Sequence, residues 1–189
     1  MRGENIGCLE LDDGEIIGIT CGGEDDEEEV MALYRAAVGT EGCTWSESYP
    51  NGNILKDDIV RRALYCARNK EGELVAAISV DDDPEVDALR NWSNFDKNCP
   101  DYGGVYAAEL ARLVVRADCQ NRGIAGRMIE YVADRIKAGD SCKPKARYVH
   151  FLVSKNNQRA LRSYAKLGWE NRGDADVFGQ KWQCYETKL

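Results

Sequence analysis

One segment constrains the fold of this 189-residue chain most: residues 120–126, with the sequence QNRGIAG. It follows an apolar run that ends at Val115 and precedes a stretch in which apolar side chains recur at helical spacing until Gly139. A turn that contains glycine at the start of a helix leaves backbone N–H groups exposed at the positive end of the helix dipole. The segment therefore predicts a strand, a phosphate-binding turn and a helix in succession.

The residues around this turn narrow the kind of phosphate site. Residues 107–115 are rich in strand formers and alternate in part, as a half-buried strand does. The chain contains neither the Gly-Lys-Ser/Thr of a Walker loop nor a Gly-x-Gly-x-x-Gly fingerprint. Those two nucleotide-binding loops are therefore excluded, and the turn by itself indicates a generic anion site.

The rest of the chain alternates between strand-like and helix-like segments without internal repeats. We expect a peripheral segment or extra strand within residues 1–14 and one domain over residues 15–189, because a single core serves chains of up to about 200 residues. Helices are expected at 24–38, 56–63, 125–138 and 157–167, and strands at 16–21, 64–68, 74–80, 107–115, 147–153, near Trp169 and at 181–188. Residues 81–104 are expected to form a long connection that either folds partly as a helix around Val86, Leu89 and Trp92 or forms a lid.

Charge and cysteine usage exclude several classes of protein. The net charge of −8 and the pI near 4.8 argue against a nucleic-acid-binding protein. Eight scattered cysteines without a Cys-x-x-Cys pair are typical of reduced thiols in a cytoplasmic protein, and the spacing of a zinc site is absent. With no signal region or membrane-spanning run, we expect a cytoplasmic enzyme or binding module without a metal and without a membrane partner.

A second motif lies in the last third of the chain, at residues 157–169, with the sequence NQRALRSYAKLGW. Ala160, Tyr164 and Leu167 share one face of a predicted helix, and Gly168 ends it. The spacing of the apolar residues alone is explained by an amphipathic helix that packs in the core. Because this helix follows the predicted phosphate-binding turn in the chain, a functional interpretation has to be weighed against that of a core helix.

Together, the two motifs resemble the GNAT superfamily of acyl-CoA-dependent N-acyltransferases. Residues 120–126 match its pyrophosphate motif with Ala125 in the last Gly/Ala position, residues 109–115 match the preceding strand, and residues 157–169 match its Asn-x-x-Ala helix with a Leu-Gly-aromatic ending. One departure is Ser163-Tyr164, where the family usually has Leu-Tyr. The resemblance implies an α+β, three-layer α/β/α fold whose mostly antiparallel central sheet is splayed between its fourth and fifth strands, after Val115, with flanking helices.

The resemblance also implies acetyl-CoA, or another short acyl-CoA, as the donor substrate, and no metal. Main-chain groups of Leu113, Val114 and Val115 would pair with the pantetheine arm as an added strand would. The other residues implied in donor binding are Gln120, Asn121, Arg122, Gly123, Ile124, Ala125, Gly126 and Asn157.

Two residues match the catalytic positions of the family. Tyr164 matches the tyrosine that protonates the departing thiolate, and a core tyrosine is the alternative interpretation. Glu109 matches the strand glutamate, which either removes the proton of the amine, through water, or only orients the acceptor. The lone histidine, His150, is expected to be structural, and a covalent route through Cys119 is disfavoured because nothing nearby in sequence would activate the thiol.

The acceptor is expected to be a primary amine on a small molecule or an amino acid, acetylated by direct attack in a ternary complex. Trp45, Tyr49 and Trp92 are the acceptor-pocket candidates because they lie in predicted loops, although burial in a core is the alternative for each. The connection that carries Trp92 could instead form a homodimer interface. Two other functions stay open: a protein or peptide N-terminal acetyltransferase, and a non-catalytic CoA-binding regulatory module.

Overall fold

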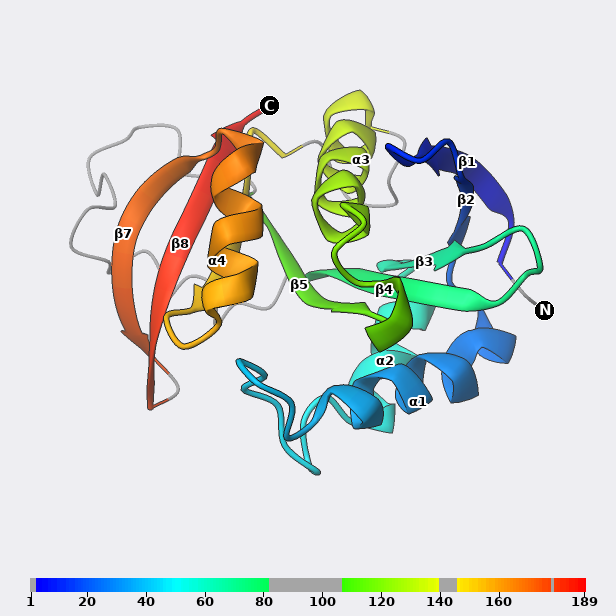
Figure 1. Ribbon diagram of the computed structural model, residues 1–189, viewed down its shortest axis with the longest axis horizontal. Coiled ribbons are helices and arrows are strands. Elements are labelled where there is room, and N and C mark those ends of the chain that lie inside the picture. Colours follow the sequence, from blue (N-terminus) through cyan, green and yellow to red (C-terminus); the bar gives the residue numbers. More distant parts are fainter. Residues whose placement is uncertain (1–2, 82–106, 140–145, 178) are drawn as a thin grey trace.

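The chain folds around one eight-stranded sheet with the order β1-β2-β3-β4-β5-β6-β8-β7. We analysed a computed structural model that describes residues 3–81, 107–139, 146–177 and 179–189 (Figure 1). Every neighbouring pair of strands is antiparallel except β5 and β6, which are parallel. The strands are β1 (Asn5–Glu10), β2 (Ile16–Cys21), β3 (Leu64–Arg68), β4 (Leu74–Asp81), β5 (Ala107–Val115), β6 (Tyr148–Ser154), β7 (Glu170–Val177) and β8 (Gln180–Lys188).

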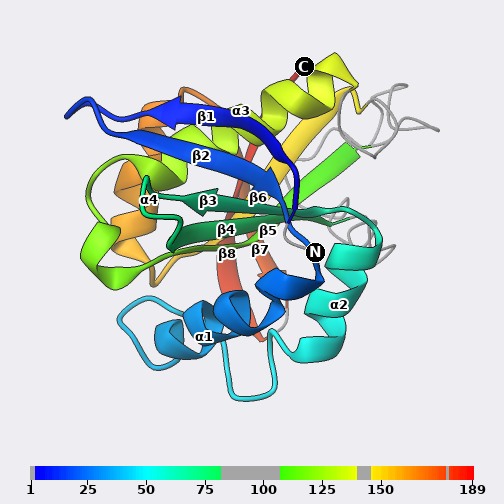
Figure 2. The same cartoon turned by 90° about the vertical axis from the view of Figure 1, so that its right-hand side faces the viewer.

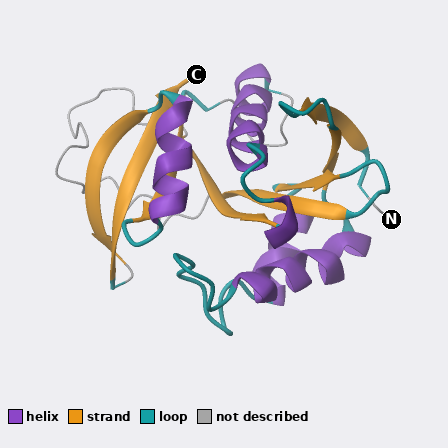
Figure 3. Cartoon of the chain, viewed as in Figure 1, coloured by secondary structure: helices purple, strands orange, loops and turns teal. Residues whose placement is uncertain are grey.

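Helices cover both faces of this sheet (Figures 1 and 3). They are α1 (Glu27–Ala37), α2 (Gly52–Val60), α3 (Ile124–Ala138) and α4 (Gln158–Tyr164). Side chains of β3 alternate between the two layers: Leu64 and Cys66 join the apolar cluster of α1 and α2, whereas Tyr65 and Ala67 join that of α3. The expected three-layer α/β/α architecture is thereby confirmed. Among the helices of the described residues, none has both the length and the apolar character needed to cross a membrane.

The bounds of the helices depend on local caps. Helix α3 ends as expected at Gly139, which has the left-handed φ of 73° that favours glycine. The expected second helix is present, but its predicted bounds of 56–63 are wrong, because α2 spans Gly52–Val60. Asn51 caps it: its Oδ1 accepts hydrogen bonds from the backbone N–H groups of Asn53 and Ile54, at 3.0 and 3.1 Å.

The sheet is splayed between β5 and β6, which are its fourth and fifth strands when β1 is left out of the count. The two strands pair over Ala107↔Tyr148, Ala108↔Val149 and Glu109↔His150. Pairing therefore ends earlier than the Val115 that was expected. A β-bulge explains the difference: β5 has one residue more than β4 between the pairs Ala111↔Ser79 and Val114↔Ala77, and a bulge bends its strand.

The hairpin of β1 and β2 lies against α3 (Figure 2). Its turn places Gly14 at a φ of 82°, a conformation that a side chain disfavours. The Tyr131 hydroxyl of α3 donates a hydrogen bond of 2.7 Å to the backbone carbonyl of Ile6 in β1. The hairpin is thus fixed to the helix that follows the turn at residues 120–126.

Candidate functional site

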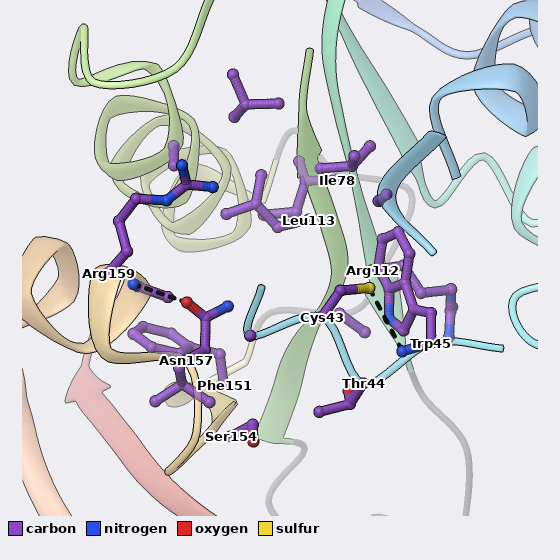
Figure 4. A pocket seen from close by; sticks show the side chains of 18 of the residues that line it. Cys43, Thr44, Trp45, Ile78, Arg112, Leu113, Phe151, Ser154, Asn157 and Arg159 are labelled. Carbon is purple, nitrogen blue, oxygen red and sulfur yellow. Dashed lines mark hydrogen bonds between the residues drawn. The ribbon is translucent and has the colours of Figure 1, made fainter. Parts of the chain in front are cut away.

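The divergence of β5 and β6 opens a cleft of about 1600 Å³. Its walls come from both strands, the loop between α1 and α2, the turn before α3, and α4 (Figure 4). These elements are far apart in the sequence, and the splayed sheet brings them together. The cleft contains most of the residues expected at the site: Trp45, Tyr49, Glu109, Leu113, Val114, Val115, Gln120, Asn121, Gly123, Ile124, Ala125, Asn157 and Tyr164.

The turn at residues 120–126 presents a row of backbone donors to this cleft. Asn121 and Gly123 have left-handed φ angles of 63° and 80°, and Gly123 is the N-cap of α3. The backbone N–H groups of residues 121–126 have no hydrogen-bond acceptor in the part of the chain that the structure describes. The Gln120 Nε2 donates to the backbone carbonyl of Val115 at 2.9 Å, which fixes the turn to the end of β5. This arrangement is chemically suited to a phosphate group.

Two of the predicted site residues are placed differently from the others. A Cβ on Gly126 would lie 3.5 Å from Leu167 Cδ2, so this glycine packs against the end of the α4 segment. The Arg122 side chain forms ion pairs with Asp13 and Glu15 of the β1–β2 hairpin. Trp92 lies outside the described residues.

The edge of β5 beyond its pairing with β6 faces the cleft. Leu113 and Val115 are partly buried against the apolar cluster of α3, and they also line the cleft. Within the described chain, β6 does not pair with β5 beyond Glu109. An open strand edge offers main-chain donors and acceptors to an extended ligand.

A buried ion-pair network, which no sequence motif indicates, lies behind this edge. Arg112, at the bulge of β5, has a left-handed φ of 53°. Its guanidinium binds Asp58 of α2 through two bonds, of 3.0 and 2.8 Å, and Asp81 through a bond of 2.6 Å. Ser79 and Arg61 also donate to Asp58, each at 2.7 Å. The Asp58 and Arg112 side chains are 0% and 5% exposed, and the two carboxylates raise the pKa of Arg112 further above its usual range.

Tyr164 lies on α4 in an aromatic environment. Its ring packs edge-on against Phe151 of β6, with ring centroids 4.9 Å apart, and Phe151 in turn stacks on Tyr185. Desolvation raises the pKa of Tyr164 to about 12, and the positive charge of Arg159 opposes this rise. The phenol is therefore protonated at neutral pH. Because Tyr164 also lines the cleft, it is both a packed aromatic residue and an available donor.

Glu109 stands at the point where the strands separate. Its cross-strand partners are His150 of β6 and Asp81 of β4. Cross-strand partners share a face of the sheet, and both Glu109 and Asp81 line the cleft. The lining of the cleft thus includes Glu109, the Asp81 that pairs with Arg112, and the turn at residues 120–126.

The loop between α1 and α2 closes one side of the cleft. The Trp45 ring packs edge-on against Tyr34, with centroids 5.1 Å apart, so Trp45 belongs to a core cluster and to the cleft wall. Tyr49 is exposed. Gly42 lies so close to Asn157 that a Cβ on this glycine would be 2.9 Å from Asn157 Cα. Figure 4 shows Cys43 and Thr44 beside Trp45, with Asn157 on the left of the central strand. We call residues 40–45 the strap.

The remaining polar candidates do not form a nucleophilic or metal site. Cys119 is buried, and desolvation raises the pKa of its thiol, which makes it a poor nucleophile at neutral pH. His150 is buried in β6. Among the described residues, no group of three or more His, Cys, Asp or Glu side chains could hold a metal ion.

Comparison with known proteins places this geometry in a family. Residues 41–169 match the family model described as acetyltransferase (GNAT) family. The fold is similar to that of a GNAT-family acetyltransferase from Streptococcus agalactiae 2603, with a TM-score of 0.71 and 17% sequence identity over 96% of this chain and 98% of that one. The comparison with curated protein sequences gave no significant match.

Two other solved structures are similar to this chain. One is an N-acetyltransferase from Staphylococcus aureus Mu50, with a TM-score of 0.65 and 17% identity over 91% of this chain and 98% of that one. The other is a ribosomal-protein-S5-alanine acetyltransferase from Vibrio fischeri, with a TM-score of 0.65 and 11% identity over 97% of each chain. At such identities the likeness establishes the fold alone.

Proposed function

Because the chain belongs to the GNAT acetyltransferase family, we propose that its cleft takes acetyl-CoA as the donor and transfers the acetyl group to a primary amine of a small molecule or amino acid. One observation carries the proposal. The same cleft is lined by the turn at residues 120–126, whose backbone N–H groups have no acceptor among the described residues, by the open edge of β5, and by Glu109 and Tyr164. These are the parts that a direct transfer between two bound substrates needs.

The donor would be held largely by main-chain groups. Residues 121–126 offer their N–H groups to the pyrophosphate, where the positive end of the α3 dipole adds to the attraction. The edge of Leu113–Val115 would pair with the amides of the pantetheine arm. When bound, acetyl-CoA supplies the activated acyl group. The residues that line the cleft would position it.

Tyr164 would act on the departing sulfur as a hydrogen-bond donor. With a pKa of about 12, its phenol keeps its proton at neutral pH. Full transfer of this proton to a thiolate, whose conjugate acid has a pKa of about 8.5, is uphill. Donation of a strong hydrogen bond to the developing negative charge is favourable, because the phenol lies in a poorly solvated, aromatic environment.

Glu109, with Asp81 beside it, would receive the acceptor amine. Glu109 on the cleft lining favours an acceptor that arrives as an ammonium, whereas the charge of Asp81 is offset by its ion pair with Arg112. The pKa of about 10.4 for an alkyl ammonium lies far above the pKa of about 4.3 for a glutamate, so proton removal would pass through water. Glu109 therefore has two candidate roles, as a base through water and as an orienting group.

The strap supports a small acceptor over an extended polypeptide. Its contact between Gly42 and Asn157 bridges the two sides of the cleft, so a chain passing through would have to displace it. The Vibrio fischeri structure is named as an acetyltransferase of a ribosomal-protein alanine, which keeps protein N-termini as the alternative acceptor class.

A thiol-release assay with acetyl-CoA tests the proposal. Polyamines, aminoglycosides, free amino acids and short peptides serve as acceptors, and the Tyr164→Phe variant serves as the control for enzymatic release. Release that requires a small amine supports the proposal. Release with peptides alone indicates the N-terminal acetyltransferase, and CoA binding without release from any acceptor indicates a regulatory module.

A further inference from the structure

The turn of the β1–β2 hairpin carries three acidic residues, and it lies against the phosphate-binding turn. The Asp13 carboxylate accepts a bond of 2.5 Å from Arg122 Nη2, and the Glu15 carboxylate binds the same nitrogen. Asp12 forms an ion pair of 2.5 Å with Arg127, one helical turn further into α3. These contacts join the N-terminal hairpin to the turn that would hold the donor phosphates.

The Arg122 side chain leaves the cleft although its backbone lies in the turn. Gln120, Asn121, Gly123, Ile124 and Ala125 all line the cleft, whereas Arg122 points to the hairpin. The Arg122 and Asp13 side chains are 31% and 53% exposed, and the ion pair lowers the pKa of Asp13 below its usual range. Ion pairs this exposed are weak, so a competing anion can replace the carboxylates.

The charges of this region oppose donor binding in the observed arrangement. Three carboxylates from the hairpin face two guanidinium groups from the turn and α3, which leaves one net negative charge beside the anion-binding N–H groups. A phosphorylated donor would bring several more negative charges to the same place.

We propose that the hairpin carboxylates of Asp13 and Glu15 and the phosphate groups of the donor compete for the Arg122 guanidinium, so that these two acidic residues set the affinity for the donor. This inference rests on the proposed function, since it takes CoA as the ligand of the turn. Arg122 then binds phosphate only when its guanidinium is released from the two hairpin carboxylates. Asp13 and Glu15 are positioning residues that act through Arg122.

Calorimetric titration of CoA into the Asp13→Asn/Glu15→Gln double variant tests the proposal. Asparagine keeps the Oδ1 that accepts a hydrogen bond from the Glu15 N–H, so the hairpin turn is preserved. We expect CoA to bind about threefold to fivefold more tightly, the range that the release of an exposed ion pair allows. The matched control is Glu4→Gln/Glu10→Gln, which removes the same two charges from the hairpin region without touching Arg122 and should leave the affinity nearly unchanged.

Repeating the titrations in an Arg122→Ala background separates competition from general charge repulsion. The gain should disappear there, because the residue for which the two anions compete is gone. Dephospho-CoA identifies the phosphate: a gain retained with this ligand assigns Arg122 to the pyrophosphate, and a gain lost assigns it to the ribose phosphate.

Three results would overturn the inference. They are an unchanged affinity in the double variant, a weaker affinity there, and a gain that persists without Arg122. If the wild-type protein does not bind CoA at all, the proposed function itself is wrong and the inference falls with it. Circular dichroism of each variant establishes that the fold is retained.

Discussion

Replacing Asp58 with asparagine would remove the charge at the centre of the ion-pair network behind the cleft. The substitution keeps the size of the side chain but leaves the Arg112 guanidinium with Asp81 as its remaining charged partner. Breaking a buried pair by removing one partner costs about 3–5 kcal/mol, because the other charge stays buried without compensation. The retained Asp81 contact places the expected loss of unfolding free energy at the lower end, about 3 kcal/mol.

Urea denaturation measures this loss directly, and the neighbouring residue provides a control. Asp57 is 63% exposed and binds Arg61 at 2.6 Å, so Asp57→Asn should cost less than about 1 kcal/mol. For a domain of this size, the Asp58 variant should also melt roughly 6–12 °C lower than the wild type. Equal stability of the two variants would refute the view that the buried network stabilises the bulge of β5.

Three further predictions concern the walls of the cleft. Tyr164→Phe should lower turnover without changing CoA affinity, and unchanged turnover in a chemistry-limited assay would contradict its role. Because the phenol has a pKa of about 12, the rate of the wild type should show no basic limb from this group below about pH 11. Glu109→Gln should remove the acidic limb of the pH–rate profile if Glu109 is a base, and an unmoved limb would leave it only an orienting role. Gly42→Ala should lower acceptor affinity and stability more than Gly39→Ala does. Both glycines have φ near 78°, but only Gly42 contacts Asn157. Equal effects of the two substitutions would contradict the assignment of the strap to the acceptor site.

The parts of the fold that local sequence determines were predicted well. The strand before the turn, the left-handed Gly123 and the helix up to Gly139 follow from apolar periodicity and glycine placement within a short stretch of chain. The predicted start of α2 was wrong because its cap is Asn51, five residues upstream of the expected start, in a segment whose Gly and Pro residues favour a loop.

The parts that depend on distant contacts were not predictable in this way. Asp58 and Arg112 are 54 residues apart, and neither belongs to a periodic or spaced motif that would indicate their pairing. The bulge that ends the pairing of β5 and β6 depends on Arg112 adopting a positive φ, which is unusual for this residue type. Trp45 was expected in the acceptor wall because it lies in a loop. The structure places it both in the wall of the cleft and against Tyr34, so lining the cleft and packing in a core are not exclusive.

The central claim, that the turn before α3 holds the phosphates of an acyl-CoA donor, is tested most directly by titrating CoA into the wild type and into Gly123→Trp. The nearest protein atom to a Cβ on Gly123 is Arg127 Nε at 3.8 Å, so the indole would extend into the space that the ligand needs. Gly72→Trp is the matched control, since Gly72 has a φ of 82° and nothing within 4 Å in a hairpin of the β3–β4 pair. We predict one-to-one CoA binding by the wild type and by Gly72→Trp, and none by a folded Gly123→Trp variant. Unchanged CoA affinity in that folded variant would contradict the claim.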